Sequence, residues 1–128
     1  NLKLVLKKVE NIALIGASSN KKRDSYKVMN FLINNGYKVF PVNPNEINNT
    51  ILGEKCYSRL CEIKDSIDMV DIFRSSEYVY DITNEAIKLN VNVIWTQEGI
   101  FDENAAKIAK DAGILFIMNE CPKKVLEN

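Results

Sequence analysis

The fold is decided by residues 12–26, which read IALIGASSNKKRDSY. The run Ile12–Ala17 is apolar and suits a strand that is buried on both faces of a sheet. A turn of small residues and a basic loop follow, and Ser25 can cap a helix that extends to about Asn35. A strand, a turn and a helix start in this order bring backbone N–H groups and cationic side chains to one point. A phosphate-bearing ligand requires such an arrangement.

Strand and helix patterns alternate along the rest of the chain. We expect strands at 37–42, 67–73, 91–96 and 114–118, helices at 2–9, 75–89 and 102–112, and an irregular segment at 45–65 with a short strand at 55–57. This alternation predicts an α/β fold: a three-layer, Rossmann-like parallel sheet of about five strands with helices on both faces. No repeat or linker divides the chain, so residues 1–128 are expected to form one domain.

The connections predict where a ligand binds. Right-handed crossovers put the second strand on one side of the first and the third strand on the other. Ligands in such sheets bind at the carboxyl ends of the strands, at the crevice where the strand order reverses. We therefore expect the site in the loops that follow the strands, after Ala17, Val42, Phe73, Thr96 and Met118.

Composition excludes several classes of function. The formal net charge is zero, so no overall attraction to nucleic acid or to an anionic membrane is expected. The three cysteines are odd in number and form no CxxC pair, which argues against a disulfide framework or a zinc site. The absence of histidine removes Ser-His and Cys-His catalysis. No apolar run has the length of a membrane span, and we expect a cytoplasmic protein.

The first loop carries the strongest ligand-binding pattern. Gly16 permits close backbone approach, Ala17 and Ser18 keep the turn narrow, and the hydroxyls of Ser18 and Ser19 can donate to phosphate oxygens. Lys22 and Arg23 add positive charge, and a guanidinium can bind phosphate through two parallel hydrogen bonds. The alternative is a solvated basic loop after a tight turn.

The second strand argues against a dinucleotide. It ends in Val42-Asn43-Pro44, without the Asp or Glu that would bind the ribose hydroxyls of NAD, and the first loop has one glycine in place of GxGxxG. Asn43-Pro44 offers a neutral wall for an adenine, or is simply a turn that ends the strand.

Two further loops complete the predicted site. Phe73-Arg74 offers an apolar face and a cation, although Phe73 can also be read as core and Arg74 as a surface charge. The segment Gln97-Glu98-Gly99 follows another strand. Glu98 is either a general acid or base, or a structural hydrogen-bond acceptor.

These motifs together resemble one family. The runs Gly16–Ser18, Ser25–Met29, Val42–Pro44, Asp68–Arg74, Trp95–Gly99 and Cys121-Pro122, with Arg23, are similar to those of the small stand-alone CoA-binding domain proteins. That fold is also like the CoA-binding domain of the succinyl-CoA synthetase alpha subunit. The resemblance implies that Gly16, Ala17, Ser18 and Arg23 hold CoA phosphates and that Val42–Pro44 and Phe73–Arg74 line the nucleotide cleft. One departure is Asn119-Glu120, where the family usually has Asp-Arg.

The leading hypothesis is therefore a protein that binds CoA or acyl-CoA without catalytic activity of its own. The alternatives are a CoA-dependent acyl-transfer enzyme, in which Cys121 lies near the pantetheine, an NAD(P)-dependent enzyme subunit, or a module that docks a protein partner or forms a homodimer. No catalytic or metal-binding residue is assigned. The predicted cofactor-binding residues are Gly16, Ala17, Ser18, Ser19, Lys22, Arg23, Ser25, Tyr26, Val42, Asn43, Pro44, Phe73, Arg74, Gln97, Glu98, Gly99 and Asn119.

Overall fold

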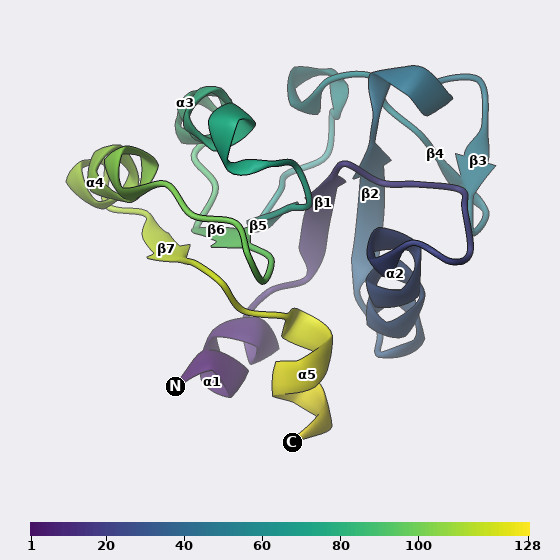
Figure 1. Ribbon diagram of the computed structural model, residues 1–128, viewed down its shortest axis with the longest axis horizontal. Coiled ribbons are helices and arrows are strands. Elements are labelled where there is room, and N and C mark those ends of the chain that lie inside the picture. Colours follow the sequence, from purple (N-terminus) through teal and green to yellow (C-terminus); the bar gives the residue numbers. More distant parts are fainter.

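A parallel sheet of five strands forms the centre of the molecule (Figure 1). The computed structural model describes residues 1–128. The strand order is β2-β1-β5-β6-β7. The strands are β1 (Asn11–Ile15), β2 (Lys38–Val42), β5 (Met69–Ile72), β6 (Val93–Thr96) and β7 (Leu115–Ile117). The predicted α/β class and the five-stranded parallel sheet are confirmed.

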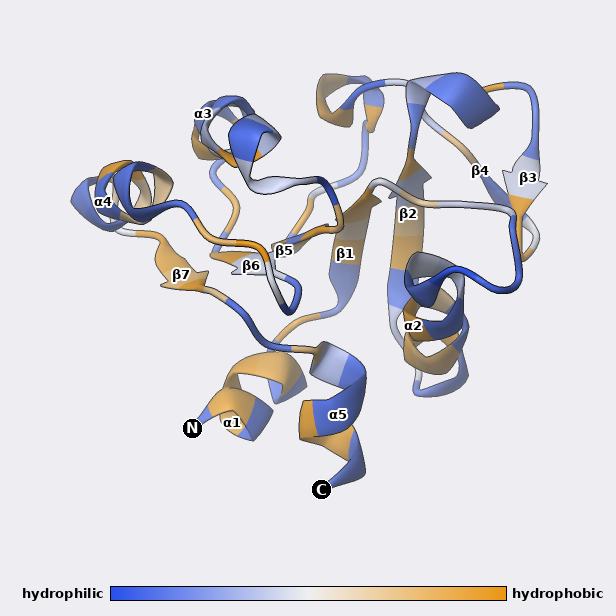
Figure 2. Ribbon diagram, viewed as in Figure 1, coloured by the Kyte–Doolittle hydropathy of each residue, from blue (hydrophilic) through white to orange (hydrophobic).

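Helices cover both faces of this sheet. One face carries α1 (Leu2–Lys7), α2 (Asp24–Asn34) and α5 (Pro122–Glu127), and the other carries α3 (Val79–Lys88) and α4 (Glu103–Asp111). Three short 3-10 helices, η1 (Pro44–Glu46), η2 (Leu60–Glu62) and η3 (Ser76–Tyr78), and a hairpin of β3 (Thr50–Ile51) with β4 (Glu54–Lys55) lie in the connections. The apolar sides of the helices turn toward the sheet in Figure 2. None of the helices is long and apolar enough to cross a membrane.

The two faces of the sheet bury separate parts of the core. Leu14 and Trp95 face α1, α2 and α5, whereas Ala13 and Ile94 face α3 and α4. Because successive residues of a strand point to opposite faces, a strand covered on both sides needs apolar residues throughout. This requirement explains the unbroken apolar runs that identified these strands in the sequence.

The strand order reverses at β1, as the crossover rule predicts. Ile15 pairs with Val42 on one side and with Ile72 on the other, so the last residues of three strands lie side by side. The loops after β1, β2 and β5 consequently emerge at the same edge of the sheet.

Several element boundaries differ from the sequence predictions. Ser25 does not cap α2; it is the buried second residue of the helix, and Arg23 takes the cap position without a side-chain cap hydrogen bond. The strand β1 ends at Ile15 because Gly16 has a φ of 88°. Gly36, with a φ of 93°, follows the end of α2 where the sequence places its stop. Helix α5 and the β3–β4 hairpin were not predicted.

Candidate functional site

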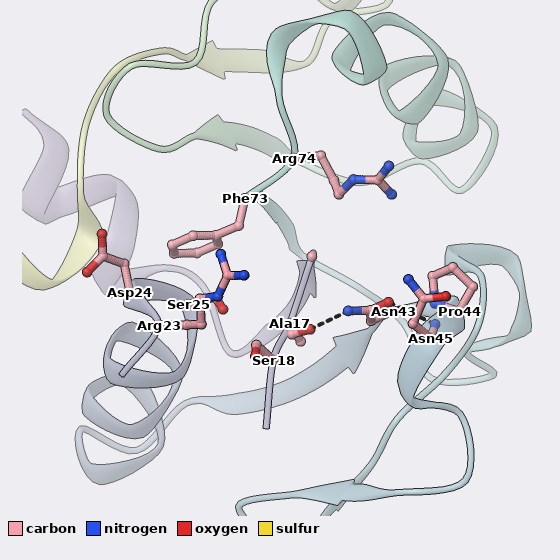
Figure 3. Close-up of a pocket in the computed structure, with 11 residues that line it drawn as sticks. Ala17, Ser18, Arg23, Asp24, Ser25, Asn43, Pro44, Asn45, Phe73 and Arg74 are labelled. Carbon is pink, nitrogen blue, oxygen red and sulfur yellow. Dashed lines mark hydrogen bonds between the residues drawn. The ribbon is translucent and has the colours of Figure 1, made fainter. Parts of the chain in front are cut away.

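A cleft of about 490 Å³ opens at the point where the strand order reverses (Figure 3). Its wall is made by three loops, those that follow β1, β2 and β5, and by the start of α2. The lining residues are Gly16, Ala17, Ser18, Arg23, Asp24, Ser25, Asn43, Pro44, Asn45, Phe73 and Arg74. In Figure 3 the segment from Asn43 to Asn45 lies across the cleft from Arg23 and Phe73.

The loops that form this cleft lie too close together for a larger residue at position 16. A Cβ atom on Gly16 would lie 3.0 Å from the Phe73 carbonyl oxygen, and its φ of 88° also favours glycine. On the other side, the Asn43 side-chain amide donates to the Ala17 carbonyl oxygen at 2.7 Å, and its Oδ1 accepts from the Asn45 N–H at 2.9 Å. Position 43 therefore holds the first and second loops together, and both ends of its amide are already used.

Backbone N–H groups without a partner lie on one side of the cleft, in the loop after β1 and at the start of α2. The N–H groups of Ser18, Asp24 and Ser25 make no hydrogen bond within the protein, and all three residues line the cleft. The first residues of a helix have no intrahelical acceptor, and the helix dipole adds partial positive charge at the same place. The start of α2 is thus suited to an anion.

Two arginines bring positive charge to the cleft. Neither Arg23 nor Arg74 forms a salt bridge, and the Arg74 guanidinium lies 4.0 Å from the centre of the Tyr78 ring. The Asp24 carboxylate points away from the cleft (Figure 3). Hydrogen bonding and charge from Glu98 raise the pKa of Lys124, and Asp24 adds a smaller effect in the same direction.

A second cavity of about 220 Å³ adjoins the first and shares Pro44 and Arg74 with it. Apolar residues from the sheet, η2 and α3 line part of it, together with the polar and charged side chains of Ser58, Arg59, Tyr78, Asp81 and Glu85. Two of these charges partly offset each other, because the Arg59 guanidinium lies 3.8 Å from the Glu85 carboxylate. Val42, predicted for the site, lines this cavity and not the first.

The structure brings together nine of the predicted site residues in the first cleft. They are Gly16, Ala17, Ser18, Arg23, Ser25, Asn43, Pro44, Phe73 and Arg74. Their part in binding a ligand stays a prediction. Both alternatives for Phe73 apply, because its ring lines the cleft and also packs against the core.

Three residues of the predicted first loop lie outside the cleft. Ser19 and Lys22 are exposed, and Tyr26 packs against the core. The Ser19 N–H donates to Glu46 at 2.7 Å. None of these three side chains belongs to the cleft lining.

The residues predicted near β6 and β7 are also absent from the cleft lining. Glu98 pairs with Lys124 at 2.9 Å, and the Gly99 N–H donates to Asn119 Oδ1 at 2.8 Å. Gln97 is buried. These contacts fit the structural reading of Glu98 as a hydrogen-bond acceptor, and they bind the loop after β6 to the end of β7 and to α5.

Some lining residues were missed by the sequence reasoning. Asp24 and Asn45 each follow a predicted residue directly, so adjacency in the chain was the available signal. Arg59, Tyr78, Asp81 and Glu85 lie in segments predicted as irregular or helical, and no sequence pattern relates them to the loops. Cys121, considered as a reactive thiol, is buried at the cap of α5. No group of three or more Cys, Asp or Glu side chains is placed to hold a metal ion.

Comparison with known proteins yields close relatives in sequence and structure. Residues 10–127 match the family model described as "CoA binding domain". The uncharacterized protein YneT of Bacillus subtilis is 34% identical over 122 residues, which cover 95% of this chain and 89% of the relative. A hypothetical protein of known structure from Pyrococcus horikoshii superposes with a TM-score of 0.94 at 35% identity, covering 98% of this chain and 87% of the other.

Larger enzymes contain a similar segment. The alpha subunit of ADP-forming acetate–CoA ligase I from Pyrococcus furiosus is 33% identical over 89 residues, which are 66% of this chain but 19% of the ligase subunit. The chain thus spans less than a fifth of that relative. The family match over nearly the whole chain, together with the shared fold, shows that this chain belongs to the CoA-binding domain family.

Proposed function

We propose that this protein binds CoA or an acyl-CoA, with the diphosphate of the ligand in the cleft between the loops after β1, β2 and β5. The observation that carries the proposal is the set of free donors at the start of α2. Three unpartnered N–H groups and the Arg23 guanidinium, which has no salt bridge, lie on this side of the cleft, and the likewise unpaired Arg74 lines the cleft from the loop after β5. Helix N-termini and guanidinium groups are general phosphate-binding devices.

The second cavity suits the adenine of the same ligand. It continues from the first at Pro44 and Arg74 and has an apolar floor that includes Ile15, Leu60 and Ile82. Purine bases bind in apolar slots with a few polar groups at the rim. The ligand would then extend from this cavity across the cleft, with its pantetheine arm leaving past Phe73.

The lining supports a holding role in preference to acyl transfer. Asp24 is the one acidic residue of the first cleft and points away from it. The acidic residues of the second cavity, Asp81 and Glu85, lie at the proposed adenine end of the ligand, and no cysteine lines either cavity. The cleft therefore contributes donors and positive charge, but no group positioned as a nucleophile or general base.

A nicotinamide dinucleotide is the competing ligand. The end of β2 offers Asn43, whose amide already bonds to Ala17 and Asn45, in place of a carboxylate for the ribose hydroxyls. Because the diol would find no acceptor of the usual kind, we expect NAD to bind much more weakly than CoA.

Isothermal titration calorimetry with CoA, ADP and NAD tests the proposal. CoA should bind in the micromolar range or tighter, and NAD should show no saturation at millimolar concentration. R23A should weaken CoA binding by roughly 30-fold, the equivalent of about 2 kcal/mol for a charged hydrogen bond. K110A removes one exposed charge on α4, a helix that contributes no residue to the cleft, and serves as the matched control. Absence of CoA binding by the wild-type protein at millimolar concentration contradicts the proposal.

A further inference from the structure

The loop 18–23, which leads from β1 to the start of α2, is joined to the second loop of the cleft by one hydrogen bond. Within residues 18–23, Ser18 Oγ accepts from the Asn20 N–H at 3.0 Å, Asn20 Oδ1 accepts from the Lys22 N–H at 2.9 Å, and the Arg23 N–H donates to the Asn20 carbonyl at 3.0 Å. These bonds join the loop into one unit. The Arg23 carbonyl also accepts from the Tyr26 and Lys27 N–H groups of α2, but none of these bonds reaches the loop after β2.

Glu46 makes the one hydrogen bond that connects this unit to a different loop. Its Oε2 accepts from the Ser19 N–H at 2.7 Å, and its Oε1 lies 3.4 Å from the Asn49 side-chain amide. Glu46 ends η1, directly after the Asn43–Asn45 wall of the cleft. Hydrogen bonding from the Ser19 side chain is the main cause that holds the pKa of Glu46 below its ordinary value, and the backbone bond from Ser19 adds a smaller effect in the same direction, so the carboxylate is ionised at neutral pH.

Neither Glu46 nor Ser19 lines the cleft. Their bond lies outside it, while the neighbouring residues, Ser18 on one loop and Asn45 on the other, line it. The bond therefore links the two walls without occupying the space between them. Asn43 makes a similar link at Ala17, but its own side chain lines the cleft, so its removal would also change contacts to a ligand.

We propose that Glu46 is a positioning residue: it accepts from Ser19 and thereby holds the loop 18–23 in the place where Ser18 and Arg23 face the cleft. This inference rests on the proposed function, because its effect on affinity presupposes a ligand between the two loops. A flexible loop must be ordered when the ligand binds, and an existing hydrogen bond removes part of that entropic cost.

A carboxylate near an anion site can also act by repulsion, and the two roles predict opposite results. As a positioning group, Glu46 increases affinity for CoA. As a repelling charge it decreases affinity. The variants E46A and E46Q separate these effects, because glutamine keeps an acceptor oxygen and loses the charge.

Calorimetric titration of CoA into E46A, E46Q and wild-type protein is the first test. We expect E46A to bind about fivefold more weakly, as for the net loss of one hydrogen bond, and E46Q to recover most of that affinity. E54A is the matched control, because Glu54 carries the same charge on the neighbouring hairpin and makes no side-chain hydrogen bond. The melting temperature of E46A should remain close to that of wild type, since Glu46 contributes nothing to the core.

Amide exchange of Ser19 in the ligand-free protein is the second test and does not depend on CoA. The Ser19 N–H should exchange several-fold faster in E46A than in wild type or E54A. Equal exchange in E46A and wild type, equal CoA affinity, tighter binding by both Glu46 variants, or an E46Q variant as weak as E46A would each overturn the inference. Loss of CoA binding by wild type, with the exchange difference present, would contradict the proposed function and leave the link itself intact.

Discussion

Replacing Asp71 should stabilise the protein, and the gain should increase with pH. Asp71 lies in the middle of β5, paired in register with Leu14 of β1 and Trp95 of β6. Its side chain is completely buried, and neither carboxyl oxygen has a hydrogen-bond partner. Desolvation by this burial raises the pKa of Asp71 well above 3.8, so the folded protein keeps the group protonated where the unfolded chain ionises it.

The sign of the pH dependence follows from this difference. Below the pKa that Asp71 has in the unfolded chain, Asp71 is protonated in both the folded and the unfolded state, and the stability contributed by the neutral acid is fully present. As pH rises above about 4 the unfolded state alone loses its proton, and the free energy of unfolding falls by about 1.4 kcal/mol per pH unit until the folded group ionises. D71N cannot ionise, so its stability relative to wild type should rise with that slope.

Urea denaturation followed by fluorescence provides the assay. Trp95 is the single tryptophan, is fully buried and neighbours Asp71, so its emission reports loss of this part of the core. Wild type and D71N should have similar midpoints near pH 4 and diverging midpoints at higher pH. Parallel pH profiles of the two proteins would refute the reasoning, because the other titrating groups cancel in the comparison.

Three further predictions concern single residues. G16A should lower the free energy of unfolding by about 1–3 kcal/mol, measured by urea titration, because of the positive φ and the Cβ contact with Phe73. G113A has a positive φ but open space around the Cβ position, so it should lower the free energy of unfolding by less; equal losses in the two variants would contradict the crowding at Gly16. D102A should lower the free energy of unfolding by about 1 kcal/mol in the same assay, because Asp102 caps α4 by accepting from the Ala105 N–H at 2.9 Å. D102N should retain most of the stability, and no loss in D102A would show that the cap is dispensable. Cys121, which is buried, should react with a thiol reagent far more slowly than the exposed Cys61, as peptide mass mapping would show, and rapid labelling of Cys121 in the folded protein would contradict its structural placement.

The sequence was most informative where one physical constraint acts alone. Strands buried on both faces must be apolar throughout, and helices beside them show a regular apolar spacing, so the α/β class and the strand order were both predictable. The reversal of strand order then placed the loops after β1, β2 and β5 together, and nine predicted residues lie in one cleft.

The errors arose where several weak signals compete. Ser25 has the chemistry of a helix cap, but the turn at Asn20–Arg23 starts the helix two residues earlier, with Arg23 at the cap, and Ser25 is buried. The start of α5 carried a usable signal, since Pro122 occupies the first helical position, where proline is favoured. The β3–β4 hairpin has strands of two residues, too short for an alternation pattern.

The loop after β6 shows the limit for the site itself. Its position depends on bonds to distant segments, from Glu98 to Lys124 and from Gly99 to Asn119. No local pattern reports such pairings, so Gln97, Glu98 and Gly99 were assigned to the crevice from their place after a strand. The second cavity was missed for the same reason, because Arg59 and Glu85 come from separate segments that meet only in the fold.

An NMR titration of the isotope-labelled protein with CoA tests the central claim most directly. Saturable shifts of the backbone amides of Ser18, Asp24 and Ser25, accompanied by those of Asn45 and Arg74, are the predicted result. These amides are free donors or lie on the walls of the cleft, so a diphosphate bound there must alter them. An unchanged spectrum at millimolar CoA, or shifts confined to a distant surface such as that around Leu4 and Leu115, would contradict binding in this cleft.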